Sequence, residues 1–112
     1  MMAQGVLSTK NKKAIEMYTE ADNYRVRFQY PQAIDLLTQA ISKDKNFFEA
    51  YLRLGYCYQS IHNYAKANEN FEAGLRVTPE LRWQKVFWIE LCNNGMKLGN
   101  YKQVQGYAEQ YL

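Results

Sequence analysis

Residues 51–79 have the sequence YLRLGYCYQSIHNYAKANENFEAGLRVTP, in which bulky and small side chains recur among polar ones at helical spacing. Tyr51, Leu54, Gly55 and Tyr58 follow one another at intervals of three, one and three residues, which places them on one face of a helix. The following residues repeat this periodicity after a short polar break. The stretch therefore predicts two amphipathic helices joined by a turn.

The same pattern occurs 34 residues earlier in the chain. Seven small or apolar positions of the second unit have a counterpart of the same size class in the first, and this agreement indicates an internal repeat. The matched pairs are Ala21 and Gly55, Tyr24 and Tyr58, Tyr30 and Tyr64, Ala33 and Ala67, Leu37 and Phe71, Ala40 and Gly74, and Ile41 and Leu75.

A third copy follows at a different spacing. Residues 99–101, Gly-Asn-Tyr, resemble residues 62–64, His-Asn-Tyr, at an offset of 37 instead of 34. Three additional residues correspond to almost one helical turn. We therefore expect the helix that ends near Leu98 to be one turn longer than its counterparts.

These observations predict an all-α fold with six helices, at residues 10–27, 30–43, 47–61, 64–77, 79–98 and 100–112. Pro31 fits the first turn of the second helix, because a backbone N–H at that position would have no acceptor within the helix. Thr78 and Pro79 are expected to form an N-cap and a first-turn proline for the fifth helix. Asn63 and Asn100 are predicted N-caps of the fourth and sixth.

The composition excludes several classes of function. The net charge is only +3, and basic and acidic residues alternate along the chain, so no stripe for nucleic acid is evident. No apolar run approaches the roughly 20 residues of a membrane span. One histidine, His62, and two cysteines, Cys57 and Cys92, show no metal-ligand spacing. We expect no cofactor, no catalysis and buried thiols, although the sequence leaves a disulfide open.

The repeated positions of the second unit, Tyr51 to Pro79, resemble the tetratricopeptide repeat (TPR) family. The first unit departs from the family pattern at Glu20 and Lys45, and the third at Gly95 and Val104. The resemblance implies a superhelical solenoid of about three helix–turn–helix repeats with a concave groove. It implies a flexible segment over residues 1–9 and a single domain over 10–112, with units at about 14–47, 48–81 and 82–112.

A narrower resemblance concerns residues 8–15, STKNKKAI, together with Tyr18, Ala21 and Asp22. This stretch is similar to the start of the TPR segment in Bacteroidetes OmpA-family, PorE-like components of the type IX secretion system. It implies a piece of a larger peptidoglycan-associated protein of the periplasm, at the outer membrane, with another secretion-machine subunit as partner. The alternative is a free-standing cytosolic adaptor or secretion chaperone.

In TPR proteins the first helix of each unit lines the groove that holds a partner protein or peptide. Arg53 and Tyr56 are the strongest candidates here, because one helical face presents both and both residue types are enriched in interface hot spots. Packing against a neighbouring helix is the alternative for each candidate. The resemblance places the partner-binding residues at Tyr18, Asp22, Arg25, Glu49, Leu52, Arg53, Tyr56, Gln59, Asn93 and Lys97.

Two further expectations concern binding. Some TPR proteins hold a C-terminal carboxylate with lysine, asparagine and arginine side chains, but here Tyr18 and Asp22 occupy the first two of those positions. An acid at Asp22 would repel a carboxylate, which argues against this clamp. The sixth helix has an apolar stripe that we expect to be covered by further chain or by a second copy in a homodimer: Val104, Tyr107, Ala108 and Tyr111.

Overall fold

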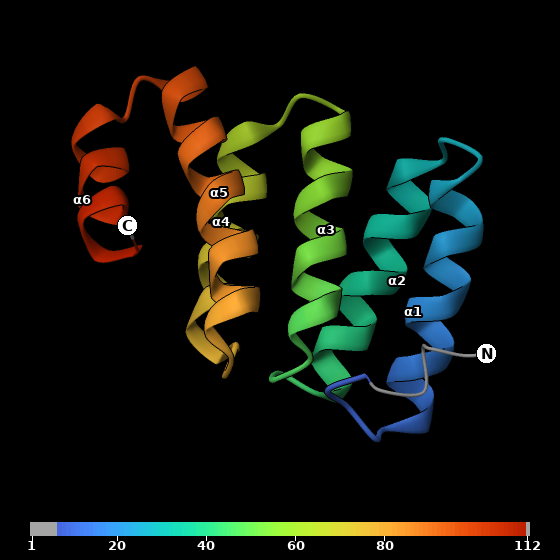
Figure 1. The fold of residues 1–112 in the computed structure, drawn as a ribbon. Coiled ribbons are helices and arrows are strands. Elements are labelled where there is room, and N and C mark those ends of the chain that lie inside the picture. Colours follow the sequence, from blue (N-terminus) through green and yellow to red (C-terminus); the bar gives the residue numbers. More distant parts are fainter. Residues whose placement is uncertain (1–6, 112) are drawn as a thin grey trace.

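The computed structural model describes residues 7–111, and over that range the chain forms six helices and no strand (Figure 1). The helices stack in chain order as three antiparallel hairpins, each packed against the next, which confirms the predicted all-α solenoid fold. They are α1 Lys12–Arg25, α2 Tyr30–Lys43, α3 Phe48–Ser60, α4 Tyr64–Val77, α5 Leu81–Leu98 and α6 Tyr101–Tyr111.

The helix bounds agree closely with the periodicity. The bounds of α2 and α4 match the prediction, and the described ends of the others differ from it by one or two residues. Helix α5 has 18 residues, whereas α1 has 14 and α3 has 13, so the longer third-unit helix is confirmed. Asn63 caps α4 as predicted, because its side-chain oxygen accepts a hydrogen bond from the backbone N–H of Lys66 at 3.2 Å.

The predicted start of α5 is wrong. Thr78 is the C-cap of α4, and its hydroxyl donates to the carbonyl of Gly74, so it serves the end of one helix and not the start of the next. Pro79 follows that cap, a common place for a residue that cannot continue a helix. Helix α5 begins at Leu81 after Glu80, whose side chain makes no cap hydrogen bond.

Small residues under aromatic rings set the spacing between neighbouring helices, both within the second hairpin and between the second and third. The ring of Phe71 on α4 lies on Gly55 of α3, and the ring of Phe87 on α5 lies on Gly74 of α4. Both phenylalanines are fully buried. Because neither glycine has a side chain, the ring packs directly on the backbone of the facing helix, and the repeated small positions act as the sequence predicts.

Two adjacent residues at the start of α3 join the two halves of the core. Phe47 packs in the first cluster, with its ring centroid 4.9 Å from that of Tyr18. Phe48 belongs to the second cluster, 5.5 Å from the Trp83 ring and 6.4 Å from the Phe87 ring. These aromatic side chains therefore fill the spaces between helices.

The three hairpin turns share one backbone device. After the end of each first helix, the turn contains one residue in the left-handed region: Phe28 at φ 62°, His62 at φ 63° and Gly99 at φ 78°. These positions are equivalent in the repeat. In each turn the next backbone N–H returns to a carbonyl five residues earlier, as in a Schellman cap. Glycine suits this conformation, and phenylalanine does not.

Both ends of the described chain make packing contacts. Residues 1–6 of the predicted flexible segment lie outside the described residues, but Thr9 is buried, and Ser8 donates two hydrogen bonds to the Glu49 carboxylate. The apolar stripe of α6 is half-buried against its neighbours: Val104 lies on Gly95, and the Tyr107 hydroxyl donates to Glu72 at 3.2 Å.

Glycine-to-alanine changes test the ring-on-backbone packing. A methyl group at Gly55 would overlap the Phe71 ring, so we expect Gly55→Ala to lower the free energy of unfolding by about 1–3 kcal/mol. The control is Gly106→Ala in α6, where nothing lies within 4 Å of the added carbon. That change should raise stability by roughly 0.5–1 kcal/mol. Urea denaturation measures both, and equal effects would contradict the packing account.

The left-handed turn predicts opposite effects at equivalent positions. Phe28→Gly removes an unfavourable backbone conformation, so we expect it to raise the free energy of unfolding by up to about 1 kcal/mol. Gly99→Ala introduces the same strain with open space around it and should destabilise by about 1 kcal/mol. Thermal denaturation checks the signs; a lower melting temperature for Phe28→Gly would contradict this account.

Candidate partner-binding face

The first helices of the three hairpins, α1, α3 and α5, present the residues predicted to bind a partner, and we call this surface the α1–α3–α5 face. Tyr18 and Leu52 are buried, at 8% and 9% exposure, so they belong mainly to the core. Asn93 and Lys97 are exposed. The remaining six are half-buried: Asp22, Arg25, Glu49, Arg53, Tyr56 and Gln59.

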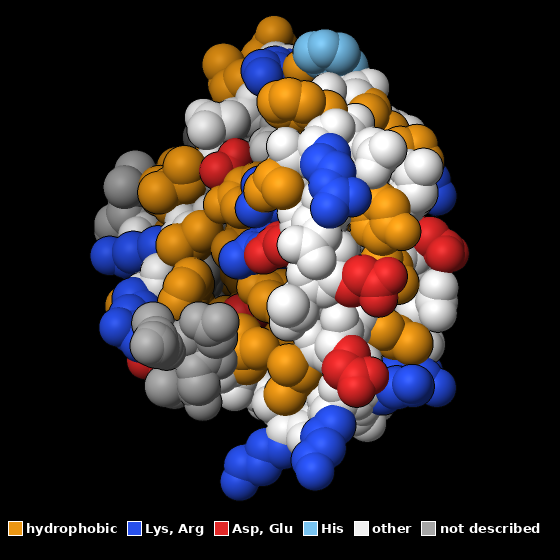
Figure 2. Space-filling model, turned by 90° about the vertical axis from the view of Figure 1, so that its right-hand side faces the viewer, with side chains coloured by type: hydrophobic (Ala, Val, Ile, Leu, Met, Phe, Trp, Pro, Cys, Tyr) orange, Lys and Arg blue, Asp and Glu red, His pale blue; other side chains and the backbone are white. Residues whose placement is uncertain are grey.

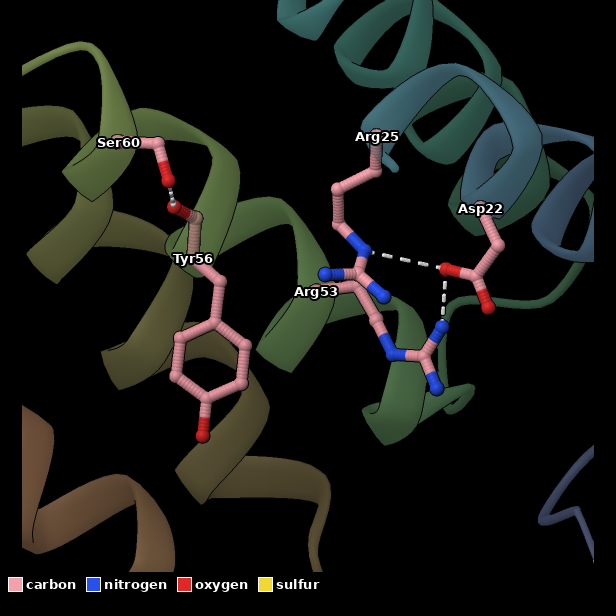
Figure 3. A network of polar contacts seen from close by, with 5 residues as sticks. All are labelled: Asp22, Arg25, Arg53, Tyr56 and Ser60. Atoms are coloured by element: carbon pink, nitrogen blue, oxygen red, sulfur yellow. Dashed lines mark hydrogen bonds and ion pairs between the residues drawn. The ribbon is translucent and has the colours of Figure 1, made fainter. Parts of the chain in front are cut away.

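Asp22 is the centre of a polar cluster between the first two hairpins (Figure 3). Its Oδ1 accepts a hydrogen bond from Nε of Arg25 at 3.3 Å and forms an ion pair with Nη1 of Arg53. Asp22 and Arg25 come from α1, whereas Arg53 comes from α3. One carboxylate therefore holds two guanidinium groups and links two repeats across the face.

Arg53 also contacts an aromatic ring. Its guanidinium carbon lies 4.8 Å from the centre of the Tyr18 ring, within the range of a cation–π interaction. Burial favours the neutral form of Arg53, but the hydrogen bond to Asp22 and the neighbouring charges outweigh burial, so the pKa of Arg53 is raised. Burial also raises the pKa of Tyr18, which therefore remains a neutral phenol. The cluster places a permanent cation against an aromatic ring.

Tyr56 is directed away from this cluster, as Figure 3 shows. Its ring meets that of Phe71 edge-on, at 5.8 Å between centroids. Burial raises the pKa of Tyr56, and the nearby carboxylate of Glu90 adds to that shift. Although Arg53 and Tyr56 are on the same helix, the structure places their side chains in different surroundings.

An amide network that sequence reasoning missed joins the second and third hairpins. Nε2 of Gln59 donates to Glu90 at 2.9 Å and to Oδ1 of Asn94 at 3.0 Å. Asn94, which is fully buried, donates in turn to Oδ1 of Asn68 at 3.0 Å. Repeat spacing gives no clear signal for this network, because the equivalent positions are polar in other repeats as well: Asn23 for Asn94 and Gln105 for Asn68.

The other predicted residues take part in separate contacts. The Lys97 ammonium lies 4.6 Å from the centre of the Tyr64 ring, at the turn end of α5. Glu49 is held by Ser8 at the opposite end of the face. It borders a cleft between the N-terminal residues and the starts of α3 and α5, lined by Leu7, Ser8, Phe48, Glu49, Pro79, Glu80, Arg82 and Trp83.

The cysteines and acidic residues offer no reactive centre within residues 7–111. Both cysteines are free thiols. Cys57 is fully buried, and burial raises its pKa to about 11, so it is protonated at neutral pH. The described histidine, cysteine and acidic side chains form no group able to hold a metal ion. His62 is exposed in its turn, where Nδ1 lies 3.0 Å from the Tyr64 hydroxyl.

The stacked helical hairpins define an α-solenoid repeat protein. Residues 27–86, more than half of the chain, match the tetratricopeptide repeat family model, and the chain belongs to that family. Intraflagellar transport protein 70A of Xenopus tropicalis is 27% identical over 62 residues. That alignment covers 55% of this chain but only 10% of the relative.

Two solved structures share the fold. The second TPR of Spaghetti (RPAP3), bound to an HSP90 peptide, has a TM-score of 0.77 at 15% identity and covers 89% of this chain and 90% of that one. MamA has a TM-score of 0.78 at 22% identity and covers 92% of this chain and 55% of that one. None of the helices between residues 7 and 111 combines the length and apolar character that crossing a bilayer requires.

The polar cluster predicts a measurable coupling between the first two repeats. Asp22→Asn removes the charge that Arg25 and Arg53 share, so we expect the free energy of unfolding to fall by about 1 kcal/mol, since the group is partly exposed. The control is Glu80→Gln, which breaks a surface pair with Arg82 and should cost less than about 0.5 kcal/mol.

A double-mutant cycle of Asp22→Asn with Arg53→Gln isolates their interaction. A coupling free energy near zero would show that the ion pair contributes nothing to holding the repeats together.

Proposed function

We propose that this chain is a non-enzymatic protein-interaction module whose α1–α3–α5 face binds an extended or helical segment of a partner protein. The observation that supports this most directly is the cluster of Asp22, Arg25 and Arg53. Two guanidinium groups share one carboxylate oxygen, so the cluster carries one net positive charge. The Arg25 and Arg53 side chains keep 36% and 29% of their surface exposed.

This arrangement favours a partner that supplies an acidic or carbonyl group. Arginine presents five N–H donors in a planar fork, and one carboxylate oxygen cannot occupy the donors of two guanidinium groups. Asp22 alone would repel a carboxylate, but the surrounding arginines make the net charge of the cluster positive. An acidic side chain of a partner would therefore fit beside Arg25.

The fold supports the same class of ligand. The TPR of Spaghetti, which this chain resembles over most of its length, is bound to an HSP90 peptide. At 15% identity that likeness concerns the backbone alone. Peptide binding by this chain therefore rests on the residues of its own α1–α3–α5 face.

A finer proposal concerns the biological setting. The resemblance of residues 8–22 to PorE-like proteins supports a role within a larger periplasmic, peptidoglycan-associated component of the type IX secretion system. The partner would then be another subunit of the secretion machine. A cytosolic adaptor or secretion chaperone is the alternative, and cell fractionation with the native gene separates the two. Homodimerisation through α6 stays a prediction that sedimentation velocity would test.

A peptide selection tests the binding face. We expect 12-residue peptides selected from a random displayed library to be enriched in acidic residues, because the cluster is net positive. Arg25→Gln should weaken the selected peptides roughly tenfold, while Asp22 and Arg53 keep their ion pair. Fluorescence anisotropy measures the affinities. The control Arg76→Gln, at an exposed site on α4 and outside the face, should change them less than twofold.

Circular dichroism first confirms that each variant is folded. Peptides that bind the wild type and Arg25→Gln equally would show that the binding site lies elsewhere, and a selection without enrichment would contradict peptide binding itself.

A further inference from the structure

The turns inside the three hairpins lie together at one end of the solenoid, the upper end in Figure 1. We call this surface the turn edge and define it as residues 26–31, 60–66 and 96–103. The cation–π contact between Lys97 and Tyr64 links the third turn to the second. The connections between hairpins, at residues 44–47 and 78–80, lie at the opposite end.

The turn edge is cationic and contains no acidic residue. Its four cations are all exposed: Arg27, Lys66, Lys97 and Lys102. On α2 and α4 the first acids beyond it are Asp35 and Glu69, each about one helical turn away. Figure 2 shows apolar and basic side chains with the histidine at this upper end, and acidic side chains only lower down. At the opposite end basic residues, among them Lys10, Lys12 and Lys13, lie together with the acids Asp44, Glu49 and Glu80.

Most of the exposed large apolar side chains among the described residues also lie on the turn edge. Phe28 is 77% exposed and Val26 63%, and both extend from the first turn. Only Leu81 and Ile89 of this group lie elsewhere. The members on the turn edge are Val26, Phe28, Ile61, Met96, Leu98 and Tyr101. Apolar side chains gathered in one region mark an interaction surface, whereas scattered ones do not.

Phe28 contributes little that the fold requires. It occupies a left-handed position at which the third repeat has Gly99, and its side chain is mostly in solvent. Such a residue lowers stability without filling the core. Its ring contacts only the neighbouring Tyr30 closely enough to be an aromatic pair, at 6.4 Å between centroids. A large apolar group in this place therefore indicates that Phe28 contacts something other than its own chain.

A row of tyrosines supports the turn edge. Tyr30, Tyr64 and Tyr101 occupy equivalent positions as the first residues of α2, α4 and α6. Tyrosine has an apolar ring and a polar hydroxyl, and for that reason it is enriched where a membrane meets water. The turn edge thus combines outermost apolar tips, exposed cations and tyrosines just behind them.

We propose that the turn edge binds the surface of a membrane that contains anionic lipids. The apolar tips Val26, Phe28 and Ile61 would enter the headgroup region, and the surrounding cations would face lipid phosphates and carboxylates. A flat surface meets the ends of three parallel hairpins at once, whereas an acidic protein would need a groove shaped to this projecting edge. Binding in this way requires no membrane-spanning helix and leaves the α1–α3–α5 face free for a partner protein.

The probe is a set of vesicles of phosphatidylcholine with about 30% phosphatidylserine, compared with phosphatidylcholine alone, in a sedimentation assay. We expect the wild-type chain to bind the anionic vesicles and to be released as salt is added. The double variant Val26→Ser, Phe28→Gly should lose at least tenfold in affinity. Arg27→Gln and Lys102→Gln should each weaken binding about fivefold. The control Leu81→Ser, an exposed apolar residue at the opposite end, should leave binding unchanged.

The proposal is overturned by three results. The first is no binding to anionic vesicles at low salt. The second is an equal loss for Leu81→Ser and for the turn-edge variants, all shown to be folded by circular dichroism. The third result combines two observations: no variant binds vesicles, and the double apolar variant still binds polyglutamate. That result would assign the turn edge to an acidic protein. Failure of the peptide experiment on the α1–α3–α5 face would not affect these outcomes.

Discussion

The packing of an aromatic ring on a bare helix backbone is the contact on which the remaining structure depends. Phe71 on Gly55 packs the two helices of the second hairpin together, and Phe87 on Gly74 packs the third hairpin on the second. In a solenoid each repeat contacts only its neighbours, so a hairpin needs the next one to cover its apolar face. At the offset of 37, α5 ends within one residue of the position equivalent to the end of α3 but begins four residues before the position equivalent to Phe48, so its extra turn lies at its start.

The polar contacts across the hairpin interfaces depend on that spacing. Gln59 reaches Asn94 because the rings of Phe71 and Phe87 hold α3 and α5 against α4. The ring contact of Tyr18 with Phe47 holds α1 beside α3, where Asp22 reaches Arg53. Apolar packing alone would tolerate a small slide of one hairpin along the next. A buried amide pair such as Asn94 and Asn68 would lose its partner in such a slide, and an unpaired buried amide costs about 1–3 kcal/mol. The polar links therefore hold the repeats in one register, and they set the positions of the exposed arginine donors on the α1–α3–α5 face.

The sequence predicts whatever depends on local periodicity. Helix positions, the small residues and the longer α5 all follow from spacing along one chain segment. The pairing of Arg53 with Asp22, and not with Tyr56, depends on a neighbouring helix 31 residues away, so helical spacing cannot reveal it. Thr78 illustrates the same limit, because its hydroxyl can serve the end of α4 or the start of α5 and only packing chooses. The buried amides were missed because asparagine is usually an exposed residue, and because the equivalent positions of other repeats, Asn23 and Gln105, are polar too.

The two ends of the hairpins differ because stability in a solenoid is the sum of contacts between neighbours. The end where one hairpin passes to the next carries Phe47 and Phe48, and these buried rings connect both clusters of the core. Large changes there would disturb two interfaces at once. The turns within the hairpins carry no such contacts, so a residue as unfavourable as a left-handed Phe28 affects only its own turn. Such a fold can keep exposed apolar and basic residues at the turn edge without weakening the interfaces that hold it together.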